Sequence, residues 1–308
     1  MSVAAIVLAM PKVNWADMSQ PVTLVTGASG FLGKSFVREA QKTGESLLCL
    51  THTRESEVYD NVQTVGLGDY LKHSEAINVT KIVHLATNYG RNAKSLVSVV
   101  EANIELPLRL IENHIDTLRH FVNIDSYFTK PVAIQDYLWE YSLSKRQLLE
   151  WLKRLSTSFS TSNVVLEHLY GPGDSPEKFA PWITASMIQS KDIALSDGTQ
   201  LRDWIYVTDA ARALALIASQ PLDSLGQGVS EFGLGSGAAL SVRRFAEEVA
   251  AVTRTKSNIT FDSKLNRPSE PSRSIADISR LTRLGWRPST TLQSGIQALV
   301  EFERKRTS

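Results

Sequence analysis

Apolar and polar residues alternate along the first half of the chain in blocks that predict strands and helices in turn. Short, almost wholly apolar runs predict buried strands at 22–27, 46–52, 62–69, 81–87, 119–125 and 162–169. Longer segments with apolar residues every three or four positions predict amphipathic helices at 31–44, 95–115 and 137–156. Strands that are buried on both faces and joined by helices are typical of a doubly wound parallel sheet, so the predicted fold class is α/β.

The pattern loosens after about residue 170, where turn-forming segments such as GPGDSP and SDGTQ separate shorter helical and strand-like stretches. At 308 residues the chain is long enough to bury a full core. We therefore expect a first domain over 20–169 and a smaller α/β region over 170–308, some segments of which return to the first domain.

Composition and charge argue against several classes of partner. The chain has 33 basic and 32 acidic residues, so its formal net charge of +1 indicates neither a nucleic acid nor an acidic membrane. An apolar stretch at 3–10 is shorter than the roughly 20 residues that span a bilayer, and no basic residue precedes it as in a signal peptide. The single cysteine, Cys49, can form neither an internal disulfide nor a metal cluster. We expect a cytoplasmic protein with a buried structural thiol and no metal.

Three glycines are spaced three residues apart where the first predicted strand gives way to the first predicted helix, in the sequence TGASGFLG. Glycine permits a tight turn and lets a ligand approach the backbone, and a helix N-terminus offers unpaired N–H groups to a phosphate. Ordinary tight loops also contain glycines, but this position in an α/β sheet predicts a dinucleotide site. The residues expected along the dinucleotide are Gly27, Ser29, Gly30, Phe31, Leu32 and Gly33.

A tyrosine and a lysine are spaced four residues apart on the predicted helix 137–156. Residues at this spacing share a helix face, so Tyr141 and Lys145 should lie side by side. A lysine ammonium favours the phenolate and lowers a phenol pKa from about 10 toward neutrality. The spacing alone occurs by chance on many surface helices. Downstream of the glycine motif, it predicts that Tyr141 is the acid or base of an alcohol–ketone interconversion.

Together these motifs resemble those of the extended short-chain dehydrogenase/reductases, the group of nucleotide-sugar epimerases, dehydratases and 4-ketoreductases. The resemblance covers the chain from Val22 to Phe302, and it also rests on GD at 68–69, HLAT at 84–87, Asn103, YGPGD at 170–174, RDWIYVTDAARAL at 202–214 and LGWRPSTTLQSGI at 284–296. Local sequences such as NIDSYF and YSLSKRQLLEWL look most like the reductases that make CDP-abequose or CDP-paratose. The resemblance implies a Rossmann fold, a nicotinamide dinucleotide, a nucleotide-sugar substrate and a homodimer.

The resemblance also assigns roles to residues of the first half of the chain. Ser126 corresponds to the hydroxyl that hydrogen-bonds the substrate oxygen, although a serine at a strand end can also simply cap a turn. Asp69, at the end of the third predicted strand, resembles the acid that meets the adenine ring. The segment that runs beside the cofactor riboses and phosphates corresponds to Leu85, Ala86 and Thr87.

The substrate-binding residues implied by the resemblance belong mainly to the second half of the chain. Arg202 resembles the arginine that grips the substrate diphosphate, for which a bidentate guanidinium is suited, and Arg267 would assist it. His168 takes the place of an asparagine near the substrate, where a purely structural histidine is an equal alternative. The full set is Thr87, His168, Phe179, Arg202 and Arg267.

Two departures from the family pattern bear on the cofactor and on the reaction. The second predicted strand lacks the Asp or Glu that binds the ribose hydroxyls of NAD, and Thr53 and Arg54 follow it instead. Arg54 would attract a 2′-phosphate, which favours NADP(H); NAD is the alternative if Arg54 is a solvated loop charge. The 4,6-dehydratases place an Asp and a Glu directly after the catalytic hydroxyl, where this chain has Tyr127 and Phe128. Dehydration is therefore disfavoured.

These features predict an NADPH-dependent enzyme that reduces the C4 ketone of a nucleotide-linked 4-keto-6-deoxyhexose. Ser126 would polarise the carbonyl, and Tyr141 would supply the proton. Lys145 would keep the Tyr141 pKa low and would bind the nicotinamide ribose. An NAD-dependent 4-epimerase that uses the same three residues is the alternative enzyme. A non-catalytic dinucleotide-binding scaffold is a remoter alternative, because such proteins usually lose the tyrosine or the lysine.

Overall fold

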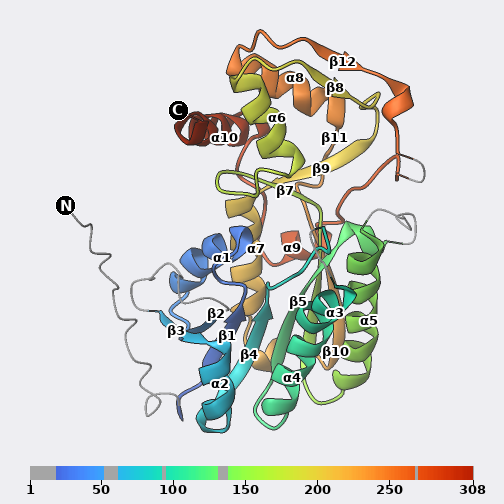
Figure 1. Ribbon diagram of the computed structural model, residues 1–308. Helices are drawn as coiled ribbons and strands as arrows, with labels where there is room; N and C mark the ends of the chain where they lie inside the picture. The colour runs from blue at the N-terminus through green and yellow to red at the C-terminus, as the bar shows by residue number, and fades with distance from the viewer. Residues whose placement is uncertain (1–18, 52–61, 92–94, 131–137, 268–269, 308) are drawn as a thin grey trace, which may run out of the picture.

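A seven-stranded parallel sheet forms the lower part of the molecule (Figure 1). The computed structural model describes residues 19–51, 62–91, 95–130, 138–267 and 270–307. The strands of this sheet are β1 (Val22–Thr26), β2 (Leu47–Thr51), β3 (Gln63–Gly66), β4 (Val79–His84), β5 (His120–Ser126), β6 (Ser160–Leu166) and β10 (Gly228–Leu234). Their order in space is β10-β6-β5-β4-β1-β2-β3, so the chain starts inside the sheet, builds one side and then crosses over to build the other. This is the doubly wound Rossmann arrangement, and it confirms the predicted fold class.

Helices cover both faces of this sheet (Figure 1). They are α1 (Phe31–Gln41), α2 (Leu67–His73), α3 (Leu96–Val100), α4 (Leu106–Asn113), α5 (Trp139–Leu155), α7 (Val207–Ala218) and α9 (Ser279–Arg283). Successive strand residues face opposite layers, because Leu24 joins the core made with α4 and α5, whereas Val25 joins the core made with α1 and α7. Burial on both faces explains why the strands form nearly continuous apolar runs in the sequence.

A smaller region lies above the carboxyl ends of the strands (Figure 1). Its elements are β7 (His168–Tyr170), α6 (Phe179–Ile188), β8 (Ile193–Leu195), β9 (Leu201–Tyr206), β11 (Ala239–Ser241), α8 (Val242–Thr253), β12 (Ile259–Phe261) and α10 (Leu292–Thr307). Strands β11, β9 and β7 form one small sheet, and β12 pairs with β8. The core of this region contains the stacked rings of Trp204 and Phe245, whose centroids lie 4.0 Å apart.

Three predicted elements differ from the observed ones. The third strand ends at Gly66 rather than at Asp69, because the chain turns there into α2. The predicted helix 95–115 is interrupted by a π-helical turn, Glu101–Glu105, which carries the buried Asn103. The predicted strand 162–169 is split between β6 and β7, which belong to different sheets. Short 3-10 segments lie at Ser74–Ala76, Tyr127–Thr129, Leu222–Ser224 and Ser263–Leu265.

Cys49 lies on β2 with its thiol buried, as predicted. Burial raises the pKa of this thiol from 9.0 to about 12, so it stays protonated and packs as an apolar group. Among the described residues, no helix combines the length and the apolar content that crossing a membrane would take.

Candidate active site

The glycine-rich turn between β1 and α1 is held in its shape by close backbone contacts. Gly27 has a φ of +70°, in the left-handed region, and a Cβ there would lie 2.5 Å from the Ala86 nitrogen. A Cβ on Gly33 would lie 2.0 Å from the Gly27 carbonyl oxygen. Helix α1 begins directly after Gly30, so its first N–H groups point out of the turn. A pyrophosphate-binding turn needs these properties.

The segment after β4 runs along this turn and is fixed to β1. The Leu85 N–H donates to the Thr26 carbonyl (3.2 Å), and the Ala86 N–H donates to Thr26 Oγ1 (3.2 Å). Thr87 Oγ1 donates to Oδ1 of Asn103 (3.3 Å), which lies in the π-helical turn. The structure therefore places the two predicted cofactor-binding segments against one another.

A cavity of about 870 Å³ lies between the carboxyl edge of the sheet and the upper region. Its volume falls within the range of about 300–1,000 Å³ that is usual for small-molecule sites. The predicted site residues that line it are Gly27, Ser29, Gly30, Phe31, Leu32, Gly33, Leu85, Ala86, Thr87, Ser126, Tyr141, Lys145, His168, Phe179, Arg202 and Arg267. Two further predicted residues, Thr53 and Arg54, lie outside the described residues.

Asp69 is the predicted site residue that the structure places elsewhere. Because β3 ends at Gly66, Asp69 lies in the first turn of α2, where the helix dipole stabilises a carboxylate. Its side chain is 70% exposed and forms an ion pair with Lys72 (3.0 Å). The described residues that line the cavity include Leu67 but not Asp69. The expected position of Asp69 at a strand end is therefore wrong.

The structure brings Ser126, Tyr141 and Lys145 together on one wall of the cavity. Tyr141 and Lys145 are buried one turn apart on α5, and the Lys145 Nζ lies 5.8 Å from the Tyr141 ring centroid. Ser126 is the last residue of β5, and its side chain lies near enough to the Tyr141 phenol to oppose the rise of the phenol pKa. The Lys145 ammonium donates to the Ile124 carbonyl (2.8 Å), which ties it to the same strand.

Burial governs the protonation of the tyrosine and the lysine. It raises the pKa of Tyr141 well above 10, and the nearby Tyr89 adds to this rise, whereas the Ser126 side chain opposes it. Burial also lowers the pKa of Lys145 from 10.5 to about 8, while the Asp125 carboxylate opposes that shift. The expectation that Lys145 brings the Tyr141 pKa toward neutrality is therefore wrong, because burial shifts this pKa in the opposite direction. The phenol is protonated at neutral pH and can donate its proton.

The 3-10 turn Tyr127–Thr129 carries two aromatic side chains into the site. The Phe128 N–H donates to Ser126 Oγ (3.3 Å), so this serine caps the turn and also faces the tyrosine. The Phe128 ring meets the Tyr141 ring edge-on at 6.3 Å, and the Tyr127 ring lies 4.1 Å from that of His168. Neither aromatic side chain can act as an acid–base pair for dehydration at neutral pH.

Five carboxylates belong to the described residues that line the cavity; Glu177 is exposed, and the other four are engaged by the protein itself. Asp125 accepts a hydrogen bond from the Ser126 N–H (2.7 Å). The other three form ion pairs: Asp174 with Lys178 (2.9 Å), Glu270 with Arg202 (2.6 Å) and Glu167 with Lys130. Hydrogen bonds to a carboxylate favour its charged form, although burial raises the pKa of Glu167 and of Asp174. Each of the four groups would have to give up one of these contacts before it could serve as the acid or the base of a dehydratase.

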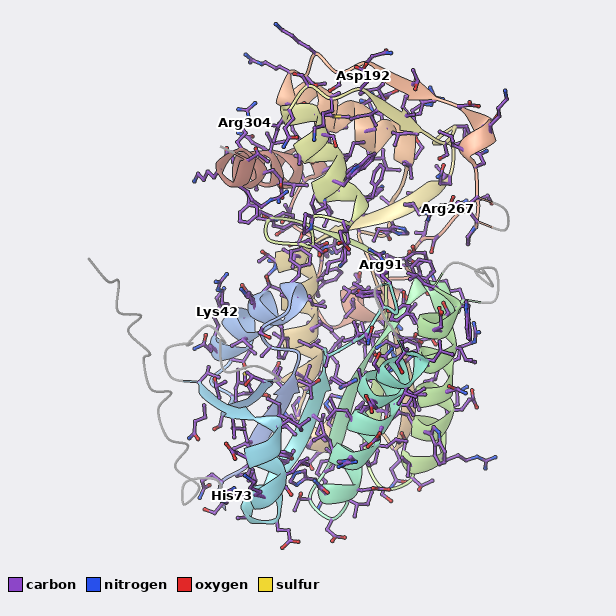
Figure 2. All side chains as sticks on the ribbon, viewed as in Figure 1. Lys42, His73, Arg91, Asp192, Arg267 and Arg304 are labelled. Atoms are coloured by element: carbon purple, nitrogen blue, oxygen red, sulfur yellow. The ribbon has the colours of Figure 1, made fainter. Side chains whose placement is uncertain are left out.

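The predicted substrate residues line the upper part of the cavity. The Arg202 guanidinium is buried, and it is held by Glu270. Arg267 approaches from the segment after β12, as Figure 2 shows, and Phe179 begins α6. Burial lowers the pKa of His168 well below 6.5, and the charge of Arg202 adds to this effect, so the imidazole is neutral.

The sequence analysis missed a second lysine in the cavity wall. The Lys178 Nζ lies 5.7 Å from the ring centroid of Phe31, in the glycine turn, and 5.3 Å from that of Tyr89. The Tyr89 ring lies in turn 4.8 Å from the ring of Tyr141. Lys178 therefore connects the glycine turn with the surroundings of the tyrosine. The available signal was its position directly before an apolar helical run, which by itself indicates no function.

Comparison with known families gives a match over most of the chain. The model of the NAD dependent epimerase/dehydratase family matches residues 23–229, from β1 to the start of β10. This chain belongs to the NAD dependent epimerase/dehydratase family. It is accordingly an NAD(P)-dependent enzyme of the extended short-chain dehydrogenase/reductase type, and the resemblance inferred from its motifs is confirmed.

Individual relatives of this epimerase/dehydratase family member cover nearly its whole length. The CDP-abequose synthase of Salmonella muenchen is 28% identical over 288 residues, which are 91% of this chain and 97% of the relative. The solved UDP-glucose 4-epimerase of Thermotoga maritima, with UDP-glucose, has a TM-score of 0.79 at 19% identity and covers 94% of this chain and 100% of its own. The UDP-glucose 4-epimerase of Thermus thermophilus, in complex with NAD, has a TM-score of 0.74 at 21% identity, with coverages of 92% and 99%. The two solved structures support the fold.

The glycine turn fits the nicotinamide dinucleotide of this family. Gly27 and Gly33 let β1, α1 and the segment at Ala86 approach more closely than any side chain would allow. The exposed backbone at the start of α1 then faces the cavity. The residues that would hold the dinucleotide are Gly27, Ser29, Gly30, Phe31, Leu32, Gly33, Leu85, Ala86, Thr87, Tyr141 and Lys145.

Proposed function

We propose that the chain reduces the C4 ketone of a nucleotide-linked 4-keto-6-deoxyhexose with NADPH, as a step of deoxysugar biosynthesis. The observation that carries this proposal is the placement of Ser126, Tyr141 and Lys145 on one wall of the cavity, with Tyr127 and Phe128 directly after Ser126. A ketone reduction needs a group that still holds its proton, whereas oxidation of an alcohol needs one that has already lost it. Tyr141 is in the first of these states at neutral pH, because its pKa lies above the ordinary value of 10.0.

The residues around the ketone have distinct tasks in this proposal. A nicotinamide dinucleotide held at the glycine turn would supply the hydride. The Ser126 hydroxyl polarises the carbonyl oxygen, and Tyr141 donates its phenolic proton to that oxygen as negative charge develops on it. The Lys145 ammonium stabilises the phenolate that remains and binds the nicotinamide ribose. Arg202, Arg267, Phe179 and His168 hold the nucleotide sugar.

The end of the second strand supports NADPH over NADH. β2 ends at Thr51, which lines the cavity and donates to the Val65 carbonyl (3.5 Å), so no carboxylate occupies that position. The sequence continues with His52, Thr53 and Arg54, which lie outside the described residues. An arginine here would attract a 2′-phosphate, whereas a carboxylate would repel it.

Two observations support reduction over dehydration. The turn after Ser126 presents Tyr127 and Phe128 where a dehydratase has carboxylates, and the cavity carboxylates at Asp125 and Glu167 are bound by their own neighbours. In addition, two CDP-abequose synthases are 28% identical to the chain, whereas two dTDP-glucose 4,6-dehydratases that cover as much of it are 23% identical.

The chain is also proposed to act as a homodimer. Large apolar side chains are exposed on two adjacent helices, with Leu96 at 58% and Val97 at 61% on α3 and Trp151 at 54% on α5. Apolar side chains gathered in this way favour contact with another protein surface. A second copy of the chain is the occupant that the family resemblance implies.

The deciding experiment for the reaction follows NADPH absorbance with CDP- or dTDP-4-keto-6-deoxyglucose. We expect NADPH to be consumed mole for mole with the keto sugar, and the unmodified nucleotide hexose not to be dehydrated. A 4-epimerase returns the hydride to the same sugar, so it would show no net change in cofactor. Interconversion of UDP-glucose and UDP-galactose without loss of NADPH would therefore replace this proposal by the epimerase.

A further inference from the structure

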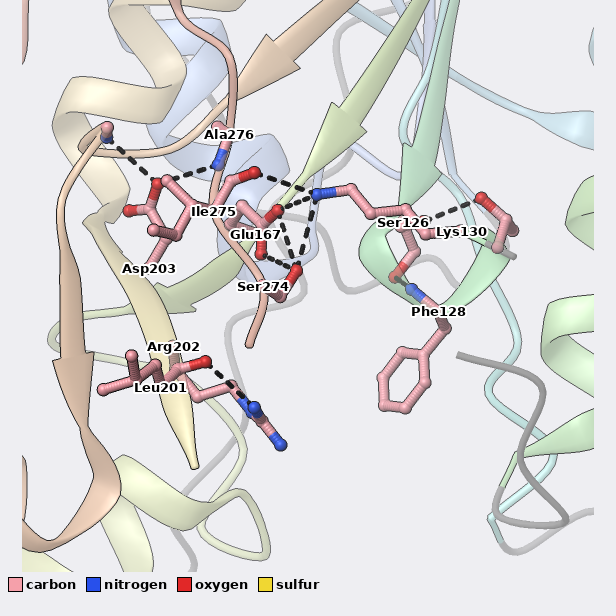
Figure 3. Close-up of polar contacts among 12 residues, drawn as sticks. Ser126, Phe128, Lys130, Glu167, Leu201, Arg202, Asp203, Ser274, Ile275 and Ala276 are labelled. Carbon is pink, nitrogen blue, oxygen red and sulfur yellow. Dashed lines mark hydrogen bonds and ion pairs between the residues drawn. The ribbon is translucent and has the colours of Figure 1, made fainter. Parts of the chain in front are cut away.

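An ion pair ties the turn after Ser126 to the upper region of the molecule (Figure 3). Lys130, directly after this turn, pairs with Glu167, which lies between β6 and β7. The Lys130 ammonium also donates to the Ile275 carbonyl (3.2 Å) and to Ser274 Oγ (3.4 Å). A single side chain therefore joins the end of the turn to two other segments of the chain.

Glu167 is buried and fully engaged in this arrangement. Its side chain is 0% exposed, whereas that of Lys130 is 34% exposed. The Ser274 hydroxyl lies 2.7 Å from one carboxylate oxygen and 3.0 Å from the other, and the Glu167 N–H donates to the Leu234 carbonyl (2.9 Å). A buried carboxylate is tolerated only when it is paired and hydrogen-bonded, so this geometry depends on Lys130 remaining in place.

The last residue of the turn, Thr129, which directly precedes Lys130, is bonded back to the end of β5 in the parallel sheet. Thr129 Oγ1 donates to the Ser126 carbonyl (2.8 Å) and to Asp125 Oδ1 (3.0 Å), both at the end of β5. At the start of the turn, the Tyr127 ring lies against His168, which directly follows Glu167. Movement of the Lys130 end would therefore shift both the ring of Tyr127 and the hydroxyl of Ser126.

We propose that Lys130 is a positioning residue, whose ion pair with Glu167 holds the Ser126 hydroxyl and the Tyr127 ring in place at the site. Lys130 acts through the turn, because it is not among the described residues that line the cavity. The contribution of Ser126 to turnover rests on the proposed function, whereas the placement of Tyr127 does not.

The kinetic test compares Lys130→Met, Lys130→Arg and Lys153→Met. Methionine removes the charge and keeps the length, arginine keeps the charge, and Lys153 supplies a matched control because its pair with Glu150 (2.6 Å) lies on the exposed surface of α5. We expect Lys130→Met to lower kcat on the order of 100-fold, the usual effect of misplacing a reacting group by about 1 Å. The KM for NADPH should stay unchanged, Lys130→Arg should recover most of kcat, and Lys153→Met should match the wild type.

Three kinetic outcomes would overturn the positioning role. The first is a wild-type kcat in Lys130→Met. The second is a loss that Lys130→Arg does not recover. The third is a parallel loss of kcat and NADPH binding together with a lower unfolding temperature, since general destabilisation would then account for it.

Near-ultraviolet circular dichroism of the substrate-free protein separates this inference from the proposed function. The ring of His168 lies between those of Tyr127 and Trp204, with centroid distances of 4.1 Å to Tyr127 and 5.4 Å to Trp204. Aromatic rings fixed in this way should give a near-ultraviolet signal. Lys130→Met should reduce this signal and Lys130→Arg should restore it, with the far-ultraviolet spectrum unchanged. If these spectra behave so while the wild type reduces no keto sugar, the proposed function fails and the positioning role stands. An unchanged near-ultraviolet spectrum in Lys130→Met overturns the positioning role whatever the activity.

Discussion

Tyr141 holds its proton at neutral pH, and burial raises the pKa of its phenol further. Replacing it in Tyr141→Phe removes the phenolic oxygen and keeps the ring that packs against Tyr89 and Phe128. We expect turnover to fall by about 100- to 10,000-fold, the range over which a general acid contributes, with cofactor binding retained. NADPH consumption and a fluorescence titration of NADPH measure the two quantities. Tyr206→Phe, which removes a phenol outside the described cavity lining, is the control, and an active Tyr141→Phe would mean that another group donates the proton.

Lys145 sets the expected pH dependence of the reduction. With a pKa lowered by burial to about 8, it is an ammonium below that pH and a neutral amine above it. Because the ammonium stabilises the phenolate left by proton donation, kcat should be constant near neutral pH and should fall as the pH rises through about 8. The kcat profile of the wild type checks this, and a profile with no break there would contradict it.

Lys145 also makes the stability of the fold depend on pH, and this dependence has the opposite sign to that of kcat. Between its folded pKa of about 8 and the ordinary value of 10.5, the unfolded chain binds more protons than the folded one. The contribution of Lys145 to the free energy of unfolding should therefore increase with pH across this window. The unfolding temperatures of the wild type and of Lys145→Met, measured across that pH range, test this expectation. Methionine removes the buried charge, so the difference between the two unfolding temperatures should become smaller as the pH rises.

The sequence predicted which residues lie together at the site, but not the direction in which the Tyr141 pKa is shifted. A four-residue spacing on a helix was enough to put Tyr141 and Lys145 on one face. The direction of the Tyr141 pKa depends on burial by segments distant in sequence, such as the one carrying Tyr89, and no local spacing contains that information. The pair between Lys130 and Glu167 was invisible for the same reason, because 37 positions separate its members.

At the scale of elements, the turn between β1 and α1 has almost no room for change. In Gly33→Ala the new Cβ would approach the Gly27 carbonyl to 2.0 Å, so α1 would have to move away from the turn. We expect a loss of about 1–3 kcal/mol of stability and weakened NADPH binding. Gly68→Ala is the matched control, because nothing lies within 4 Å of its added Cβ on the exposed side of α2. Gly68→Ala should gain about 0.5–1 kcal/mol of stability. Thermal unfolding measures the stability of both variants, and NADPH titration measures their cofactor binding. A Gly33→Ala variant with the stability and NADPH affinity of the wild type would contradict the crowding argument.

Element types were easier to predict than element ends. The apolar runs of β1, β2, β4 and β5 identified them as strands because both sheet faces are buried. The end of β3 was misplaced because Leu67 continues the apolar alternation, while the burial of Tyr70 in the core favours a helical turn there. The split after Leu166 likewise depends on pairing with β9, which comes much later in the chain.

At the scale of the whole molecule, the proposed homodimer predicts that replacing one exposed side chain halves the mass of the particle in solution. Trp151→Glu puts a charge among the exposed apolar side chains of α3 and α5 and should convert the dimer into a monomer. Phe302→Glu, at a side chain 38% exposed on α10, is the matched control and should leave the dimer intact. Sedimentation velocity measures both. A monomeric wild type, or a Trp151→Glu dimer, would contradict the proposed surface.

The late return of the chain to its first sheet has a consequence for how the protein is made. β10 pairs with β6 along its full length, and α7 covers the same sheet face as α1. A nascent chain that has emerged only as far as β6 therefore carries an unpaired edge strand and a half-covered apolar face, so it must wait for Leu234 before its sheet is complete. Because Leu281 and Trp286 belong to the same core, we expect a protease-resistant, cooperatively unfolding structure only after nearly the whole chain has emerged.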